Sequence, residues 1–310
     1  MAPVRGAEPA PHSMARRSPI DALLAPRIAA LLDTLPDALD GEVDAVHRAR
    51  VSSRRLRELL PPLGHVVAHD VADAARAEVR RVTRALGPVR ELDVAIALFD
   101  ELATAHGLST AARLVVRRTM VRERDAALVR LRAAMTPRRR ERLGKALAAL
   151  QGAAADAADP AAALLAAVDA RALRRAERLR AALHRAGAMY VPERLHQIRI
   201  AAKQLRYALE VAGAARRSRA TARITQLRGV QDLLGHAHDL HVLADRIRDV
   251  QTRVVRTSRP TTAALDACVT RIDEACRADH AVFMSRRAAL LALCDSLDPA
   301  AAPPRGRSVA

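Results

Sequence analysis

Two segments far apart in this chain carry the same spacing of basic residues, and this repetition constrains the fold more than any other feature. The segment HRARVSSRRLR, which begins at His47, aligns without gaps on HQIRIAAKQLR, which begins at His196. A second pair, LGPVRE from Leu86 and LGHAHD from Leu234, follows in the same order and nearly the same register. Two independent matches predict a duplicated helical unit, so we expect two related halves.

Each copy of the first segment has the period of an amphipathic helix. At about 100° per residue, the basic side chains of each copy fall within an arc of roughly 80°. They are His47, Arg50, Arg54 and Arg57 in the first copy and His196, Arg199, Lys203 and Arg206 in the second. The apolar side chains on the opposite side are Leu56, Leu59, Ile198 and Leu205. We therefore predict two helices, each with a basic face and an apolar back.

The composition indicates that the rest of the chain is helical as well. Half of the 310 residues are hydrophobic, mostly Ala and Leu, while aromatic residues make up only 1%. Ala, Leu and Arg are strong helix formers, whereas strands favour Val, Ile, Tyr and Phe. We predict an all-α fold in which aliphatic side chains pack helix against helix.

Proline, glycine and capping residues mark the expected helix boundaries. The first helix is expected to start at Ser18–Pro19 and to end between Pro36 and Gly41, and the second to run from about Glu42 to Pro61–Pro62. Further helices are expected at about 65–86, 88–106, 109–135, 137–151, 161–186, 191–212, 216–234, 236–257 and 261–296.

A weakly patterned stretch, QGAAADAADP at 152–161, is the predicted junction between the halves. The first half then covers about 18–155 and the second about 156–297. Residues 1–17 and 298–310 contain several prolines and no periodicity, so we predict that both are disordered tails.

The Leu–Gly segments are predicted to be breaks between helices. Gly87 and Gly235 would each end a helix and turn the chain. Arg90 and His238 would then start the next helices, where free backbone N–H groups favour anions. Further arginines precede these glycines and could face the same anion, namely Arg76, Arg80, Arg84 and Arg228.

The charge predicts a polyanionic partner. The formal net charge is +18, and of the 52 basic residues only Lys145 and Lys203 are lysines. Arginine binds phosphate oxygens through its planar fork, and each such charge-assisted hydrogen bond contributes roughly 1.5–3 kcal/mol. The alternative is that the basic stripes are solvated helix faces, with Arg54–Glu58 and Arg206–Glu210 as ordinary intrahelical ion pairs.

The motifs HRARVSSRRLRELL and LHQIRIAAKQLRYALE resemble the signature helices of the CHAD family, the conserved-histidine α-helical domain, and the Leu–Gly segments resemble its second signature. The resemblance covers about 18–297. It implies two four-helix bundles, related by a pseudo-twofold axis, around a basic cavity or groove. It also implies that the domain binds inorganic polyphosphate and can associate with polyphosphate granules.

The resemblance also assigns phosphate-binding positions to this sequence. They are His47, Arg50, Arg54, Arg57, Arg80, Arg84, Arg90, His196, Arg199, Lys203, Arg206 and Arg228. Two departures from the family pattern are Glu91, where Asp is usual, and His238, where Asn is usual. The Glu-x-Glu-x-Lys signature of the triphosphate-tunnel domain that is often fused to CHAD domains does not occur, so we predict a stand-alone binding protein without catalytic activity or cofactor.

Two other functions fit parts of the sequence. A metal-dependent phosphohydrolase could use the His-Asp cluster His236, His238, Asp239 and His241, although no second His/Asp cluster completes a metal shell. A nucleic-acid binder could use the charge, but the sequence holds only two Tyr, two Phe and no Trp for stacking on bases. Binding of duplex nucleic acid through its phosphate backbone remains a possible but less favoured alternative.

Cysteine usage and hydropathy favour the cytoplasm. Cys268, Cys276 and Cys294 show neither a Cys-x-x-Cys pair nor zinc-finger spacing, so we expect reduced, buried thiols. No run approaches the ~20 apolar residues that span a bilayer, and no secretory signal is recognised, so we expect a cytoplasmic protein without a membrane segment.

Overall fold

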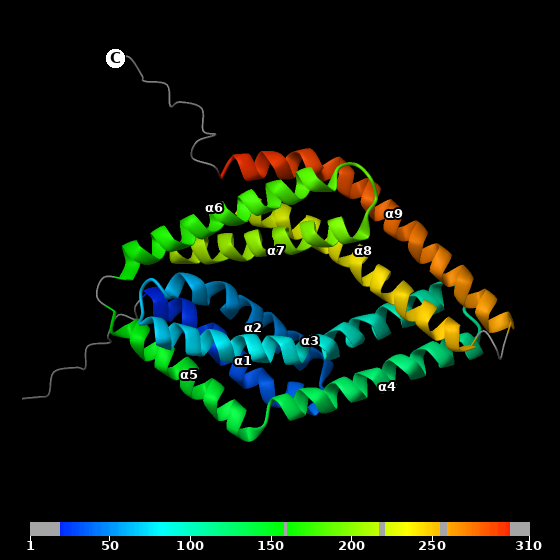
Figure 1. Ribbon diagram of the computed structural model, residues 1–310, viewed down its shortest axis with the longest axis horizontal. Coiled ribbons are helices and arrows are strands. Elements are labelled where there is room, and N and C mark those ends of the chain that lie inside the picture. The colour runs from blue at the N-terminus through cyan, green and yellow to red at the C-terminus, as the bar shows by residue number, and fades with distance from the viewer. Residues whose placement is uncertain (1–18, 158–159, 217–220, 255–258, 298–310) are drawn as a thin grey trace, which may run out of the picture.

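The computed structural model describes residues 19–157, 160–216, 221–254 and 259–297. Within these ranges the regular structure is α-helical and contains no strand, which confirms the all-α prediction (Figure 1). In chain order the helices are α1 (Pro19–Asp40), α2 (Val43–Leu63), α3 (His69–Ala105), α4 (Thr110–Ala134), α5 (Pro137–Ala155), α6 (Pro160–Ala186), α7 (Pro192–Ala215), α8 (Thr221–Val254) and α9 (Arg259–Asp295). The predicted tails and the Ser18 cap lie outside the described residues.

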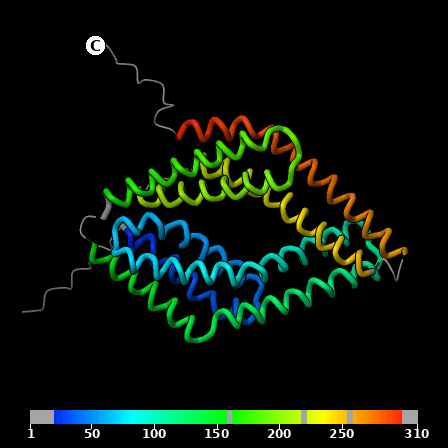
Figure 2. Tube along the Cα trace, viewed as in Figure 1, coloured from blue at the N-terminus to red at the C-terminus, as the bar shows by residue number. Residues whose placement is uncertain are grey.

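Helices that follow one another in sequence pack side by side, and equivalent helices of the two halves meet. Within the first half α1 packs on α2, α2 on α3 and α3 on α4, while α5 folds back onto α1 and α3. Within the second half α6, α7, α8 and α9 pack in the same order. The halves meet where α2 contacts α7, α3 contacts α8 and α4 contacts α9, and Figure 2 shows the two layers converging at the end where α3 and α4 approach α8 and α9.

The repeated segments occupy equivalent helices. The first pair lies on α2 and α7, and the second pair lies on α3 and α8. The halves differ after that, because the first uses α4 and α5, separated at Met135–Thr136, where the second uses the single 37-residue helix α9.

The apolar backs of α2 and α7 are buried as predicted. Leu56, Leu59, Ile198 and Leu205 are all 0% exposed. The larger of two core clusters is not confined to one half, because it also contains Leu243 and Ile247 of α8 and Leu265 of α9. The smaller cluster belongs to α6, α7 and the nearby parts of α8 and α9. The two halves therefore share a core.

Several predicted boundaries are confirmed. Gly41 and Gly107 follow the ends of α1 and α3 with φ of 97° and 60°, a conformation that glycine adopts without strain. Pro137 begins α5, and its fixed φ and missing N–H suit the first turn of a helix. The prolines Pro61 and Pro62 lie inside the last turn of α2, which ends at Leu63.

The predicted helix breaks at the Leu–Gly segments are wrong. Helix α3 continues through Gly87 and Pro88, and α8 continues through Gly235. An internal proline costs a helix about 3 kcal/mol, but fully buried side chains on both sides of Pro88, such as Leu86 and Val89, each contribute roughly 1.5–3 kcal/mol of hydrophobic stabilisation to the continuous helix.

The three cysteines are free and buried, as expected for reduced thiols. None of the described helices combines the length and apolar character that crossing a bilayer requires.

Candidate anion-binding site

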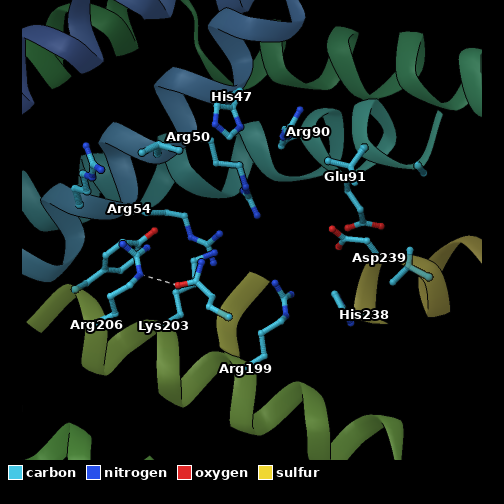
Figure 3. A pocket seen from close by; sticks show the side chains of 17 residues that line it. His47, Arg50, Arg54, Arg90, Glu91, Arg199, Lys203, Arg206, His238 and Asp239 are labelled. Carbon is cyan, nitrogen blue, oxygen red and sulfur yellow. Dashed lines mark hydrogen bonds between the residues drawn. The ribbon is translucent and has the colours of Figure 1, made fainter. Parts of the chain in front are cut away.

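A cavity of about 480 Å³ lies where α2 and α3 of the first half face α7 and α8 of the second. We refer to it as the basic cavity (Figure 3). Seven of the residues that sequence reasoning assigned to phosphate binding line it, namely His47, Arg50, Arg54, Arg90, Arg199, Lys203 and Arg206. Both repeats contribute, so side chains 149 positions apart in sequence share one space.

The central cations of the basic cavity point toward the same space and lack protein partners. Figure 3 shows Arg54 extending from α2 and Arg199 from α7 into the space between these helices. Neither of these guanidinium groups, nor the Lys203 ammonium, forms a hydrogen bond or ion pair with any described residue, and the Nε atom of Arg199 is buried without a partner. Arg50 donates from Nη1 to the Thr83 carbonyl oxygen at 3.1 Å.

Burial and mutual repulsion make these cations costly to keep charged. Burial, reinforced by Arg54, lowers the pKa of Arg50 to about 10. Burial and the surrounding guanidinium groups lower the pKa of Lys203 to about 7. The pKa values of Arg54 and Arg199 are lowered as well, mainly by burial. An anion in the cavity would remove this repulsion, so the arrangement is electrostatically prepared for one.

Gly87 allows one of these cations to reach its position. A Cβ atom at residue 87 would lie 3.1 Å from Nη1 of Arg50, closer than most side-chain contacts allow. The glycine of the Leu–Gly segment therefore provides space for Arg50 and does not end a helix. Arg90 and His238 consequently lie in mid-helix, and the prediction that these two residues start helices is wrong.

Arg206 differs from the other cations because the protein already satisfies it. Its guanidinium donates to Gln231 Oε1 at 2.8 Å, forms an ion pair with Glu210 and stacks over the Tyr207 ring at 4.4 Å from the centroid. The predicted Arg206–Glu210 pair is confirmed.

The predicted Arg54–Glu58 pair is wrong. Glu58 instead contacts Arg171 at 2.6 Å and Arg175 at 3.5 Å, both on α6. This carboxylate holds α6 against α2 and leaves Arg54 free for the cavity.

The remaining predicted residues lie outside the basic cavity. Arg57, Arg80, Arg84 and Arg228 are exposed on α2, α3 and α8 and do not line it. His196 does not line the cavity either. It contacts His238, which does line it, and the two Nδ1 atoms are 3.1 Å apart. Burial lowers the pKa of His196, and burial together with Arg199 lowers the pKa of His238 to about 4, which fits a hydrogen bond between neutral rings.

Sequence reasoning missed several lining residues. These are chiefly Arg55, Glu91, Tyr207, Gln231 and Asp239. The repeat gave part of the signal for two of them. Gln231 is the repeat equivalent of Thr83, and Asp239 is the repeat equivalent of Glu91. Arg55 gave no signal, since a helical wheel places it about 100° from Arg54 and off the basic stripe.

The His-Asp cluster of α8 does not converge on one point. His236 contacts Asp279 of α9 at 2.8 Å, and His241 lies 3.7 Å from Asp245. His238 turns to His196. In the part of the chain that the structure describes, no three His, Cys, Asp or Glu side chains are grouped so that they could hold a metal ion. The histidines of the His-Asp cluster therefore contact separate partners in this structure.

These features define an all-helical protein in which two repeated halves enclose a cationic cavity. The CHAD domain signature matches residues 22–248, and the chain belongs to the CHAD family, which is linked to polyphosphate binding. Its members generally act as binding domains and not as enzymes. No curated protein sequence gives a significant match.

Two solved structures share the fold. The CHAD domain from the plant Ricinus communis superposes with a TM-score of 0.59 at 21% identity, covering 90% of this chain and 91% of that one. PptA from Streptomyces chartreusis superposes with a TM-score of 0.63 at 20% identity, covering 86% of this chain and 97% of that one. At this level of identity the likeness establishes the fold alone.

Proposed function

We propose that this protein binds inorganic polyphosphate in the basic cavity and is not an enzyme. The observation that carries the proposal is the convergence of Arg54, Arg199 and Lys203, from both halves, without an ion pair from any of them to a described acidic side chain. Buried cations are normally paired, because leaving a charge without a partner in a poorly solvated site costs several kcal/mol. A bound anion would supply the partner that these cations lack.

Polyphosphate matches the chemistry of the cavity. It is a flexible chain that presents phosphate oxygens at every unit, so cations on two facing helices can contact successive phosphates. Arginine forks bind these oxygens in bidentate fashion, and the Lys203 ammonium adds a compact point charge. No other group on the ligand needs recognition, which fits a lining with few apolar or aromatic side chains.

Nucleic acid fits the same cavity less well. Among the lining residues Tyr207 supplies the one phenol ring; the residue is 7% exposed, and Arg206 stacks over its ring. It cannot serve as a stacking platform, on which single-strand recognition depends. A rigid duplex would not enter a space between packed helices, whereas a single phosphate chain would.

Binding to long chains would also bring the protein to polyphosphate granules, as its family resemblance implies. A fluorescent fusion would then follow the granules in cells, and the fusion that lacks the cavity cations would not.

The direct test is a titration with polyphosphate, with duplex DNA at equal phosphate concentration as competitor. We expect the triple variant R54A/R199A/K203A to lose about 1000-fold or more in polyphosphate affinity, since each cation contributes roughly 1.5–3 kcal/mol. The matched control is R138A/R140A/R142A, which removes three exposed arginines of α5 and the same net charge. Equal losses in both variants, or a preference for DNA, would contradict the proposal.

A further inference from the structure

Arg54 is a cavity cation with an acid close to it on its own helix. Glu58 follows Arg54 by four residues on α2, the spacing at which an arginine and a glutamate on one helix usually form an ion pair. The pair does not form, because Arg171 and Arg175 of α6 hold the Glu58 carboxylate. We refer to Glu58, Arg171 and Arg175 as the α2–α6 clamp.

The α2–α6 clamp is a largely buried group of charges. Arg171 Nη2 lies 2.6 Å from Glu58 Oε2, and Arg175 Nη2 lies 3.5 Å from the same oxygen. The three side chains are between 11% and 16% exposed. Arg175 also donates to the side-chain oxygen of Gln204 on α7, which fixes the direction of its guanidinium group. None of the three clamp residues lines the basic cavity, so any effect of the clamp on a ligand there is indirect.

Helix α7 carries the same four-residue spacing with the opposite result. Glu210 follows Arg206 by four residues, and the two side chains form an ion pair. Arg206 is held by the protein, whereas Arg54 extends into the space between α2 and α7 (Figure 3). The difference lies in which arginine binds the acid, and a cation is left for a ligand only where the acid is bound elsewhere.

The Glu58 carboxylate lies close enough to Arg54 to interact with it. Burial lowers the pKa of Arg54, and the charges of Tyr207 and Glu58 oppose this shift. Without Arg171 and Arg175, Glu58 would be a largely buried carboxylate that lacks its partners, which is a costly state. Arg54 is the cation that the helical spacing places within its reach.

We propose that Arg171 and Arg175 are positioning residues for polyphosphate binding: they hold Glu58 at α6, prevent it from neutralising Arg54, and so keep Arg54 available to the ligand. This inference rests on the function proposed above. Glu58 belongs to the first half of the chain and both arginines belong to the second. A contact between the halves therefore determines whether Arg54 is available, and residues that do not touch the ligand contribute to its affinity.

The test is a titration of inorganic polyphosphate against the variant R171M/R175M at fixed salt. Methionine retains an unbranched side chain that can fill the space of the arginine stem, so packing is largely preserved. We expect affinity to fall by about tenfold, because the released Glu58 competes with phosphate for Arg54. The added change E58Q should restore affinity to within about threefold of the unaltered protein, since the competing carboxylate is gone.

A double-mutant cycle separates this mechanism from a general structural role. In the background of R54A, the change R171M/R175M should cost less than about threefold in affinity, because its effect passes through Arg54. The matched control is R174M/R178M, which removes two exposed arginines from the same helix and the same net charge. This control should also lose less than about threefold, since it leaves the α2–α6 clamp intact.

Circular dichroism checks that each variant remains helical. If R171M/R175M does not fold, the single variant R171M takes its place in every comparison, because it keeps Arg175 in the clamp and removes the closer arginine. A smaller loss that E58Q restores is then the expected result.

The outcomes distinguish the two proposals. If the unaltered protein does not bind polyphosphate, the proposed function fails and this inference fails with it. If it binds, but the clamp variant binds as tightly, or E58Q does not restore the lost affinity, or the loss is equally large in the R54A background, then polyphosphate binding stands and the role of the clamp is overturned.

Discussion

The basic faces of α2 and α7 have the same spacing in sequence but different surroundings. Arg57 and Arg206 are repeat equivalents, yet Arg57 is exposed and Arg206 is only 7% exposed. The difference follows from their neighbours. Arg206 has Glu210 four residues later on the same helix, and the equivalent position on α2 is Pro61, which offers no carboxylate.

One further equivalent pair diverges, and another does not. His47 lines the basic cavity, whereas His196 contacts His238 and does not line it. Arg54 and Lys203 are equivalent, and both remain free inside the cavity. The duplication thus places the backbone of two similar helices, but neighbouring side chains decide which cations are available to a ligand and which hold the protein together.

The largest expected effect is on stability. The variant R206A should lower the free energy of unfolding by about 2–4 kcal/mol, because it leaves Glu210 and Gln231 without their partner in a largely buried site. The equivalent variant R57A should change it by less than about 0.5 kcal/mol. Urea unfolding followed by circular dichroism measures both. Similar values for the two variants would show that the halves do not differ in this respect.

A smaller effect is expected on affinity. The single variants R54A and R199A should each weaken polyphosphate binding by about ten- to 100-fold, since each removes a cation that has no protein partner. The same change at Arg57, which lies outside the cavity, should cost less than about threefold. Titration at fixed salt compares the variants. A loss of affinity in R57A as large as that in R54A would show that polyphosphate binds outside the basic cavity.

The smallest effect is on the pH dependence of binding. The pKa of Lys203 lies at about 7, below its ordinary value of 10.5, so the free protein loses this charge as the pH rises through about 7. A bound polyanion favours the charged form, and affinity should therefore fall by at most about tenfold between pH 6 and pH 8.

The variant K203R is the control for this fall, because arginine stays charged in this range. It should bind with little change over the same pH interval. A fall of the same size in K203R would assign the titration to another group, including the phosphates themselves.

Much of the fold and part of the site could be predicted from the sequence. Helical periodicity identified the buried Leu56 and Ile198, and the repeat brought Arg54 and Lys203 into one candidate site. Predictions made from neighbouring residues in sequence were wrong where packing between distant segments determines a helix boundary or an ion-pair partner. The Gly87–Pro88 pair is typical of a helix end, but buried side chains keep α3 continuous, and no local rule shows that Arg50 needs the space beside Gly87. Glu58 was assigned to Arg54 because they are four residues apart, whereas arginines of α6 compete for it across the fold.

The core that the two halves share has a consequence for how the cavity works. Because one apolar cluster contains side chains from α3, α4, α8 and α9, the halves cannot swing apart without exposing it to water. The walls are in place before any ligand arrives, so association requires no closing motion and little loss of conformational entropy from the protein itself. Encounter should then be governed by long-range attraction between the positive protein and the chain, at rates that ionic strength tunes directly.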